Sequence, residues 1–165
     1  MGQCFCPLPA LAQTSPPPGD KAPPIQDNSF LIEEAYNQED GVVQHINTFQ
    51  RQKNGDWVYT FTQEWPIGGL AHQFSYTIPL RRAESNIGFG DLALNYRYQL
   101  LGDGDAALAI SPRVSLLLPS GDERRGLGTG ATGVQVNLPV SLVVLPNLVT
   151  HWNAGATFTP SARND

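Results

Sequence analysis

The stretch Trp57-Val58-Tyr59-Thr60-Phe61-Thr62-Gln63-Glu64-Trp65 alternates between large aromatic side chains and smaller or polar ones. Side chains of a β-strand point to opposite faces in turn, so this stretch predicts a strand with one aromatic face and one polar face. Asn54-Gly55 lies just before it, between two strand-like runs, and Asn-Gly is a strong hairpin signal. We therefore expect residues 42–52 and 57–65 to form an antiparallel pair.

The same period-two pattern continues toward the C-terminus. Apolar series begin at Leu70, Leu92, Leu108, Val134 and Leu148, and each opposes a more polar series. Turn signals occur at 102–105 and 146–147, and longer connections are expected at 81–88 and 120–132. Residues 30–36 are expected to form at most one or two helical turns. The pattern predicts an all-β, antiparallel up-and-down (meander) sheet of about seven long strands, each of roughly 9–12 residues.

Strand length and charge placement indicate which kind of β-protein this is. Strands of globular proteins usually have about 5–6 residues, whereas a tilted membrane strand needs about 9–11. Residues 66–80 and 126–162 contain no Asp, Glu, Lys or Arg, and charged residues gather in the connections instead. A Lys or Arg at the lipid midplane costs about 2–4 kcal/mol, and extended chain in lipid must close into a barrel. The sequence therefore predicts part of a transmembrane β-barrel, with outer-membrane lipid as its surroundings.

An alternative is a secreted soluble β-sandwich or a lipocalin-like binding protein. In that case the aromatic side chains pack in a protein core, and strand positions facing solvent carry charge. Such charged strand positions are scarce in this sequence.

The ends of the chain and its overall charge narrow the class further. Ala10-Leu11-Ala12 before Gln13 resembles the cleavage site of a signal peptide, and five prolines follow within 13–24. We expect a partial signal peptide at 1–12, a Pro-rich disordered leader at 13–29, and a barrel domain at 30–165 that is incomplete at its C-terminus. The net charge of −5 and the absence of a basic run give a nucleic-acid partner no electrostatic support.

The polar faces of the expected strands provide the candidate functional residues. In a barrel these faces line the lumen, where the lining residues would be Glu64, Asp91, Asn95, Arg97, Arg113, Asn137, His151 and Asn153. Buried charges are normally paired, so we expect a network of Arg97 and Arg113 with Asp91 and Glu64. The network could be a structural ladder that fills the lumen or a selectivity lining for a solute. The membrane-interface aromatics would be Trp57, Tyr59, Trp65, Tyr96, Tyr98 and Trp152.

No pattern of catalytic or metal-binding residues emerges. Cys4 and Cys6 precede the expected cleavage site, and no histidine lies at a short ligand spacing from another. A Ser–His–Asp set can be chosen from Ser141, His151 and Asp91, but nothing in their spacing supports it. The Gly-rich run at 126–133 lacks the Gly-Lys-Ser/Thr ending of a phosphate loop. We expect neither an enzyme nor a cofactor.

Several segments resemble one family of bacterial outer-membrane proteins. These segments are 30–39 with 41–45, 59–66, 90–99, 112–121 and 150–155, and the likeness covers about residues 28–160. They are similar to the β-barrel transporters labelled after the MetA pathway of phenol degradation. The resemblance implies a channel or transporter-like barrel and establishes no substrate. We expect an outer-membrane protein, exported through the periplasm, that passes small molecules, hydrophobic or aromatic ones among them. The resemblance supplies no functional residues.

Overall fold

The computed structural model describes residues 32–103 and 105–160. The expected signal peptide, the Pro-rich leader, Cys4 and Cys6 lie outside the described residues.

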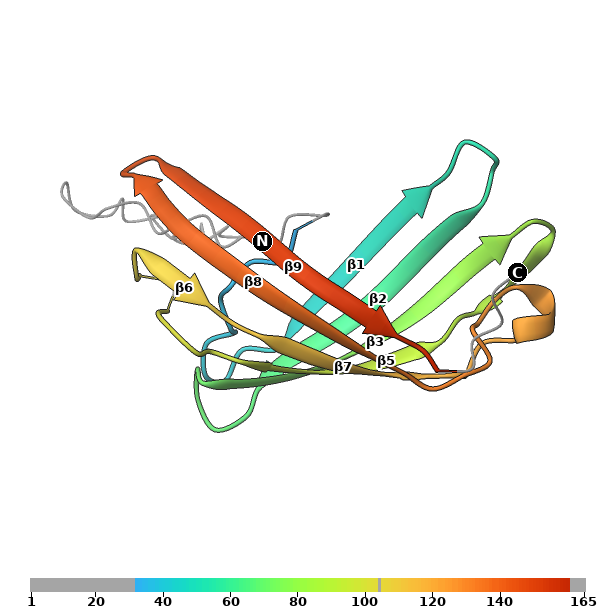
Figure 1. Ribbon diagram of the computed structural model, residues 1–165, viewed down its shortest axis with the longest axis horizontal. Coiled ribbons are helices and arrows are strands. Elements are labelled where there is room, and N and C mark those ends of the chain that lie inside the picture. The colour runs from blue at the N-terminus through green and yellow to red at the C-terminus, as the bar shows by residue number, and fades with distance from the viewer. Residues whose placement is uncertain (1–31, 104, 161–165) are drawn as a thin grey trace, which may run out of the picture.

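One antiparallel sheet accounts for the described part of the chain (Figure 1). Its strands are β1 (Gln44–Arg51), β2 (Trp57–Pro66), β3 (His72–Ala83), β4 (Asn86–Phe89), β5 (Leu92–Tyr98), β6 (Leu108–Ile110), β7 (Arg113–Leu118), β8 (Gly133–Leu145) and β9 (Leu148–Phe158). The strands follow one another as an up-and-down meander, and the sheet curls into a half-barrel, an open trough with β1 and β9 at its rims. The all-β, antiparallel meander expected from the sequence is confirmed.

Two lines of the sheet each consist of two short strands that follow one another. β4 and β5 both pair with β3, and β6 and β7 both pair with β8, so seven long lines cross the trough. Each break lies opposite a proline: Gly90 donates its N–H to the Pro79 carbonyl, and Ser111 donates to the Pro139 carbonyl. A proline has no N–H for the ladder, so pairing is interrupted there. The single strand expected over 108–118 is thus divided at Ser111.

The connection expected as a long loop at 81–88 is instead a tight hairpin. β3 extends to Ala83, residues 84 and 85 form the turn, and Ala83 pairs with Asn86. The prediction was wrong because the charged residues Arg81 and Arg82 were assigned to a loop, whereas they continue the strand. The loop expected at 120–132 is confirmed, and it contains a single 3-10 turn, η1 (Glu123–Arg125).

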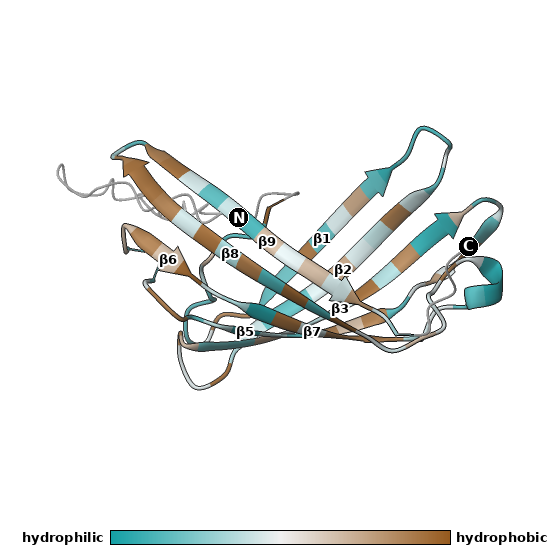
Figure 2. Cartoon of the chain, viewed as in Figure 1, coloured by the Kyte–Doolittle hydropathy of each residue, from teal (hydrophilic) through white to brown (hydrophobic). Residues whose placement is uncertain are grey.

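The register places large apolar side chains on one face of the sheet and polar ones on the other. Tyr76 lies opposite Gln63 and Leu94, whereas Ser75 lies opposite Glu64 and Asn95. Figure 2 shows the resulting alternation of hydrophilic and hydrophobic residues along the strands. The polar face is concave and largely buried, and the apolar face is convex and exposed.

No α-helix forms among residues 32–103 and 105–160. The one or two helical turns expected at 30–36 are absent over 32–36, where the chain has bends and no regular secondary structure. No helix in this part of the chain is long and apolar enough to cross a membrane.

Candidate functional site

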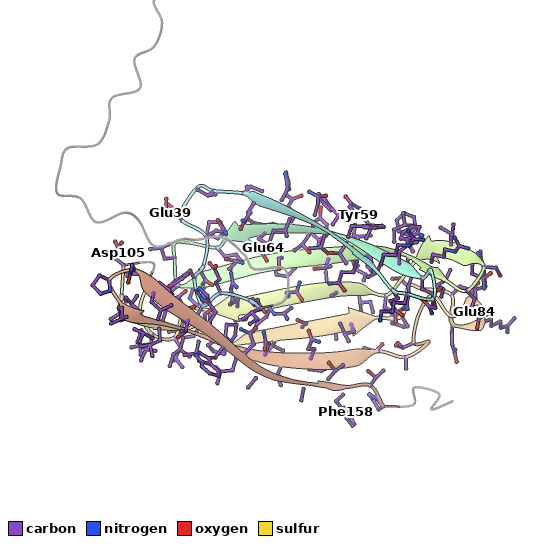
Figure 3. All side chains as sticks on the ribbon, turned by 90° about the horizontal axis from the view of Figure 1, so that it is seen from above. Glu39, Tyr59, Glu64, Glu84, Asp105 and Phe158 are labelled. Carbon is purple, nitrogen blue, oxygen red and sulfur yellow. The ribbon has the colours of Figure 1, made fainter. Side chains whose placement is uncertain are left out.

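The concave face of the trough is built from cross-strand rows of polar side chains. One row joins Glu64, Ser75, Asn95, Ser115, Gln135 and Thr157, which lie opposite one another on successive strands. The next row joins Gln73, Arg97, Arg113 and Asn137. Figure 3 looks down into the trough, with Glu64 labelled between the two ends marked by Glu84 and Asp105. Because consecutive strands are in register, residues far apart in sequence meet on one surface.

Residues 32–38, here called the 32–38 segment, lie across this polar surface. Backbone groups of the segment bond to side chains from four lines of the sheet, those of β3, β5, β8 and β9, rather than to a neighbouring strand. Ala35 N–H donates to Ser141 Oγ at 2.9 Å, Gln38 N–H donates to Gln73 Oε1 at 2.8 Å, and Gln99 Nε2 donates to the Ala35 carbonyl at 2.8 Å. The segment therefore covers much of the concave face without adding a strand to the sheet.

Arg97 is the main anchor of the segment. It is 3 % exposed, and its guanidinium donates to the Glu34 and Tyr36 carbonyls at 3.2 and 2.8 Å and to Asn37 Oδ1 at 2.9 Å. The same group lies 4.0 Å from Glu64 Oε2, which is one of the pairs expected from the sequence. Arg97 thus joins β5, β2 and the segment.

Glu33 lies between the two arginines of the concave face. Its Oε1 is 3.2 Å from Arg97 Nη1, and its Oε2 is 3.1 Å from Arg113 Nε. Asn137 Nδ2 donates to the same Oε2 at 2.7 Å, and Asn153 Nδ2 donates to the Glu33 carbonyl at 2.7 Å. β5 and β8 therefore donate hydrogen bonds to this carboxylate, and Arg113 on β7 adds an ion pair without a hydrogen bond from its Nε.

Asp91 does not join this network, so its expected pairing with the arginines was wrong. Its carboxylate accepts hydrogen bonds from Gly121 N–H at 3.0 Å and from the backbone and hydroxyl of Thr129 at 2.7 and 2.8 Å. Asp91 lies in the break between β4 and β5. Its carboxylate binds the 119–132 loop and does not face the trough. The place expected for it beside Arg113 is taken by Glu33.

Ser141 and His151 meet on the concave face under the segment. Ser141 Oγ lies 2.8 Å from His151 Nδ1, and His151 Nε2 is 3.8 Å from Glu34 Oε1. Ser141 is fully buried and its oxygen accepts the Ala35 N–H, so the segment shields it. Burial raises the pKa of the neighbouring Tyr36 phenol, and the Glu34 carboxylate acts in the same direction, so this phenol stays protonated.

The six aromatic residues expected at a membrane interface all lie on the convex face. Trp65 contacts Phe74 and Tyr76 edge to face, with ring centroids 5.2 and 6.0 Å apart. Tyr96 and Tyr98 both contact His72, whose Nδ1 is 2.6 Å from the Tyr96 hydroxyl. The remaining members, Trp57, Tyr59 and Trp152, share this face through the strand register.

Seven of the eight residues expected to line a lumen lie on the polar concave face, and their role as a lining stays a prediction: Glu64, Asn95, Arg97, Arg113, Asn137, His151 and Asn153. Sequence reasoning missed the contribution of Glu33 and Glu34, because residues 30–36 were expected to be helical. One signal could have found them. Asp91 follows a Gly-rich turn, so the predicted face had two arginines and only one well-placed carboxylate, Glu64.

Within the described residues, no group of three or more His, Cys, Asp or Glu side chains is arranged to hold a metal ion. Comparison with protein-family models, curated proteins and solved structures finds no match to the chain. The class that the structure itself defines is an antiparallel half-barrel with a polar concave face and an apolar convex face.

Proposed function

We propose that the protein is an outer-membrane β-barrel protein, exported through the periplasm, which provides a passage for small molecules. The observation that carries the proposal is the inverted polarity of the sheet. Among the described residues the buried polar set includes Glu64, Gln73, Asn95 and Arg97, whereas the exposed apolar set includes Trp152 and many aliphatic side chains. A chain in water buries its apolar residues, and a barrel in lipid reverses this arrangement.

The size of the exposed apolar surface supports lipid as the surroundings. Phe49, Trp152 and Phe158 are 63 %, 66 % and 69 % exposed, and the valines and leucines of β7 and β8 continue the same face. Soluble monomers rarely expose contiguous apolar patches larger than a few hundred Å². A hydrocarbon phase would cover this face along the length of each strand.

The two ends of the trough also differ in a way that suits a barrel in an outer membrane. The connections after β1, β3 and β7 meet at one end, the right-hand end in Figure 1, and hold many charged residues, among them Asp56, Glu84, Asp122 and Arg124. The opposite end has the two-residue turn at 146–147, flanked by exposed Leu145 and Leu148. The connection at 119–132 fits the long polar loops that outer-membrane barrels carry on the outside, whereas the two-residue turn after β3 does not.

A soluble lipocalin-like binder is the alternative, and the concave face argues against it. A lipocalin-like interior for an apolar ligand needs apolar lining, whereas this interior carries Arg97, Arg113 and Glu64 with amides and hydroxyls between them. A β-sandwich would cover the apolar face with a second sheet. The described residues form one sheet only.

A lysine scan of adjacent positions tests the proposal. Val136 lies on the convex face of β8 and is 47 % exposed, whereas Thr157 lies on the concave face of the neighbouring β9 and is also exposed. Val136→Lys should make the free energy of insertion into lipid vesicles less favourable, and the full cost of a lysine at the bilayer midplane is about 2–4 kcal/mol. Thr157→Lys should have a much smaller effect. Val136→Thr is the matched uncharged control. Folding is followed by heat-modifiable migration, and membrane fractionation and planar-bilayer conductance are measured on the same proteins.

The soluble alternative gives the opposite result. In a lipocalin-like binder the convex face meets water, and an exposed substitution changes stability by about 0.5 kcal/mol or less, so Val136→Lys would be harmless. In a β-sandwich a second sheet would cover Val136, and recovery in the soluble fraction is the result that identifies that case. Recovery of the protein as a soluble periplasmic product, together with a harmless Val136→Lys, would reject the barrel. Insertion without conductance would retain the barrel and reject the passage.

A further inference from the structure

We propose that Arg97, Arg113 and Asn137 form a binding site for the carboxylate group of a small solute, and that Glu33 occupies this site as an internal ligand. The proposal deepens the proposed function, because it names the chemical class that the passage would recognise.

The geometry around Glu33 is that of a bound carboxylate. Arg97 Nη1 reaches one oxygen at 3.2 Å, and Arg113 Nε reaches the other at 3.1 Å. Asn137 Nδ2 donates to the second oxygen at 2.7 Å. Arg97 and Asn137 thus donate hydrogen bonds to the two oxygens, and Arg113 adds an ion pair in which its Nε makes no hydrogen bond. Charge-assisted hydrogen bonds are about twice as strong as neutral ones.

Half of the site is held in place by the sheet itself. Arg113 Nη1 donates to Asn95 Oδ1 and Ser115 Oγ, both at 3.0 Å, and its Nη2 donates to Gln135 Oε1 at 3.2 Å. Asn137 Nδ2 also donates to Asn153 Oδ1 at 2.9 Å. All these partners belong to strands, so Arg113 and Asn137 keep their orientation whether or not the 32–38 segment is docked.

The strand residues alone leave a net positive charge at this position, which favours a bound anion. Without the segment, the strand groups that meet here are the cations Arg97 and Arg113 and the single carboxylate Glu64, which lies 4.0 Å from Arg97. One positive charge is then uncompensated, and a buried charge without a partner is costly. The segment supplies Glu33, and a solute carboxylate that displaces it would satisfy the same donors. The planar pair of oxygens favours a carboxylate over a halide, which offers only one contact point.

Chemical rescue provides the test in the full chain. Glu33→Ala removes the carboxylate and one methylene, a gap that acetate matches in shape. The readouts are Tm in detergent and the rate of chymotrypsin cleavage after the buried Tyr36. The variant should be cleaved roughly tenfold or more faster than the unsubstituted protein, since a hydrogen-bonded charge is lost. Added acetate should raise Tm and slow cleavage along a one-site saturation curve.

Three controls isolate the carboxylate. Acetamide is the neutral isostere, sodium chloride controls for ionic strength, and Glu39→Ala removes an exposed acidic residue next to the segment. Acetate should act on Glu33→Ala alone, and the rescue should disappear in Glu33→Ala/Arg113→Gln. Equal effects of acetate and acetamide would overturn the proposal. Phosphate in place of acetate tests for a general anion site, and an equal response to it would overturn the assignment to carboxylates.

A second measurement needs no variant. Acetate competes with Glu33 in the unsubstituted protein, so rising acetate should accelerate cleavage after Tyr36 while acetamide has no effect. If Glu33→Ala does not fold, this experiment decides, and a flat acetate response would reject the site. Binding and conductance are measured separately. Acetate binding without conductance would keep the site and reject the passage, and conductance without any acetate response would do the reverse.

Discussion

Arg97 links β5 to Glu64 on β2 and to four residues of the 32–38 segment. It contacts Glu33 and Asn37 through their side chains, and Glu34 and Tyr36 through their carbonyls. A guanidinium presents several donors in one plane, which is why one residue can satisfy four separate acceptors. Lysine has a single ammonium and could not reproduce this arrangement.

Replacing Arg97 should therefore destabilise the protein strongly. Arg97→Gln leaves two backbone carbonyls of the segment without their donor and removes the ion pair from Glu64, which keeps only its hydrogen bond from Gln73 Nε2. Breaking a buried charge pair costs about 3–5 kcal/mol. The free energy of unfolding in detergent is measured by denaturant titration. Arg124→Gln, in the exposed η1 turn, is the matched control and should change stability by about 0.5 kcal/mol or less. Equal effects of the two substitutions would contradict the anchoring role of Arg97.

Side-chain partners were harder to predict than side-chain faces. Alternation in the sequence fixes which face Arg97 and Arg113 occupy, because a strand has only two faces. Their partner depends on where a non-strand segment folds back, and local pattern does not encode the position of Glu33. Asp91 shows the same limit. Its position in the alternating pattern predicts the concave face, but its carboxylate accepts hydrogen bonds from N–H groups of the loop instead.

The hairpin between β3 and β4 contains the only non-glycine residue with positive φ among the described residues. Glu84 has φ of 54° in a turn of two residues. Left-handed backbone costs a residue with a Cβ roughly 1–2 kcal/mol, and glycine avoids this cost. The sequence therefore gave a weak turn signal here, which is why the hairpin was mistaken for a long loop.

Relieving this turn should stabilise the hairpin. Glu84→Gly removes the backbone strain, and a gain of up to about 1 kcal/mol is expected after the added flexibility of the unfolded chain is counted. The Glu84 N–H still donates to Asp56 Oδ1, since that contact uses only the backbone of residue 84. Ser85→Gly is the control and should bring no gain, because Ser85 does not have a positive φ. A loss of Tm in Glu84→Gly would show that the turn is not strained.

The breaks between β4 and β5 and between β6 and β7 depend on prolines of the partner strands. For this reason the sequence of the broken strand alone did not predict them. Nothing in the run 108–118 marks a break except Pro112, and Leu108, Ile110, Val114 and Leu116 keep one alternating pattern across it. The interruption is completed by Pro139 on β8, opposite Ser111. Strand partners are set by topology, so a single run of sequence does not reveal them.

At the scale of the whole molecule, the apolar faces of β2, β3, β5, β7, β8 and β9 are turned outward, whereas the outward positions of β1 are mixed, with His45 and Asn47 beside Phe49. The sheet curls toward its polar side, where the 32–38 segment and the arginine–glutamate network fill the trough. Alternation alone predicted two faces but could not say which one is concave. The polar contacts on the inside connect β3, β5, β7, β8 and β9 through one short segment, and such contacts favour a curl toward the polar side.

The two rims of the trough should be its least protected strands. β1 and β9 each pair with one neighbour in the described sheet, and both run in the same direction because the meander has seven lines. Joining them directly would require parallel pairing, and an all-antiparallel closure needs an odd number of strands between them. Their outward N–H groups have no sheet partner in this part of the chain, and unpaired edges recruit other strands.

Amide hydrogen exchange on the 165-residue chain in detergent measures this directly. Alternate amides of β1 and β9 should exchange much faster than those of the central strands β3, β5 and β7, because backbone hydrogen bonds on both sides slow local opening. Light scattering on the same sample gives the mass of the particle and serves as the control for association. Slow exchange at both rims in a particle of one chain would contradict the open trough. Slow exchange together with a doubled mass would show that the rims of two chains pair with each other. The contacts would be parallel for two chains of the same orientation and antiparallel for two chains related by a two-fold axis across the strands.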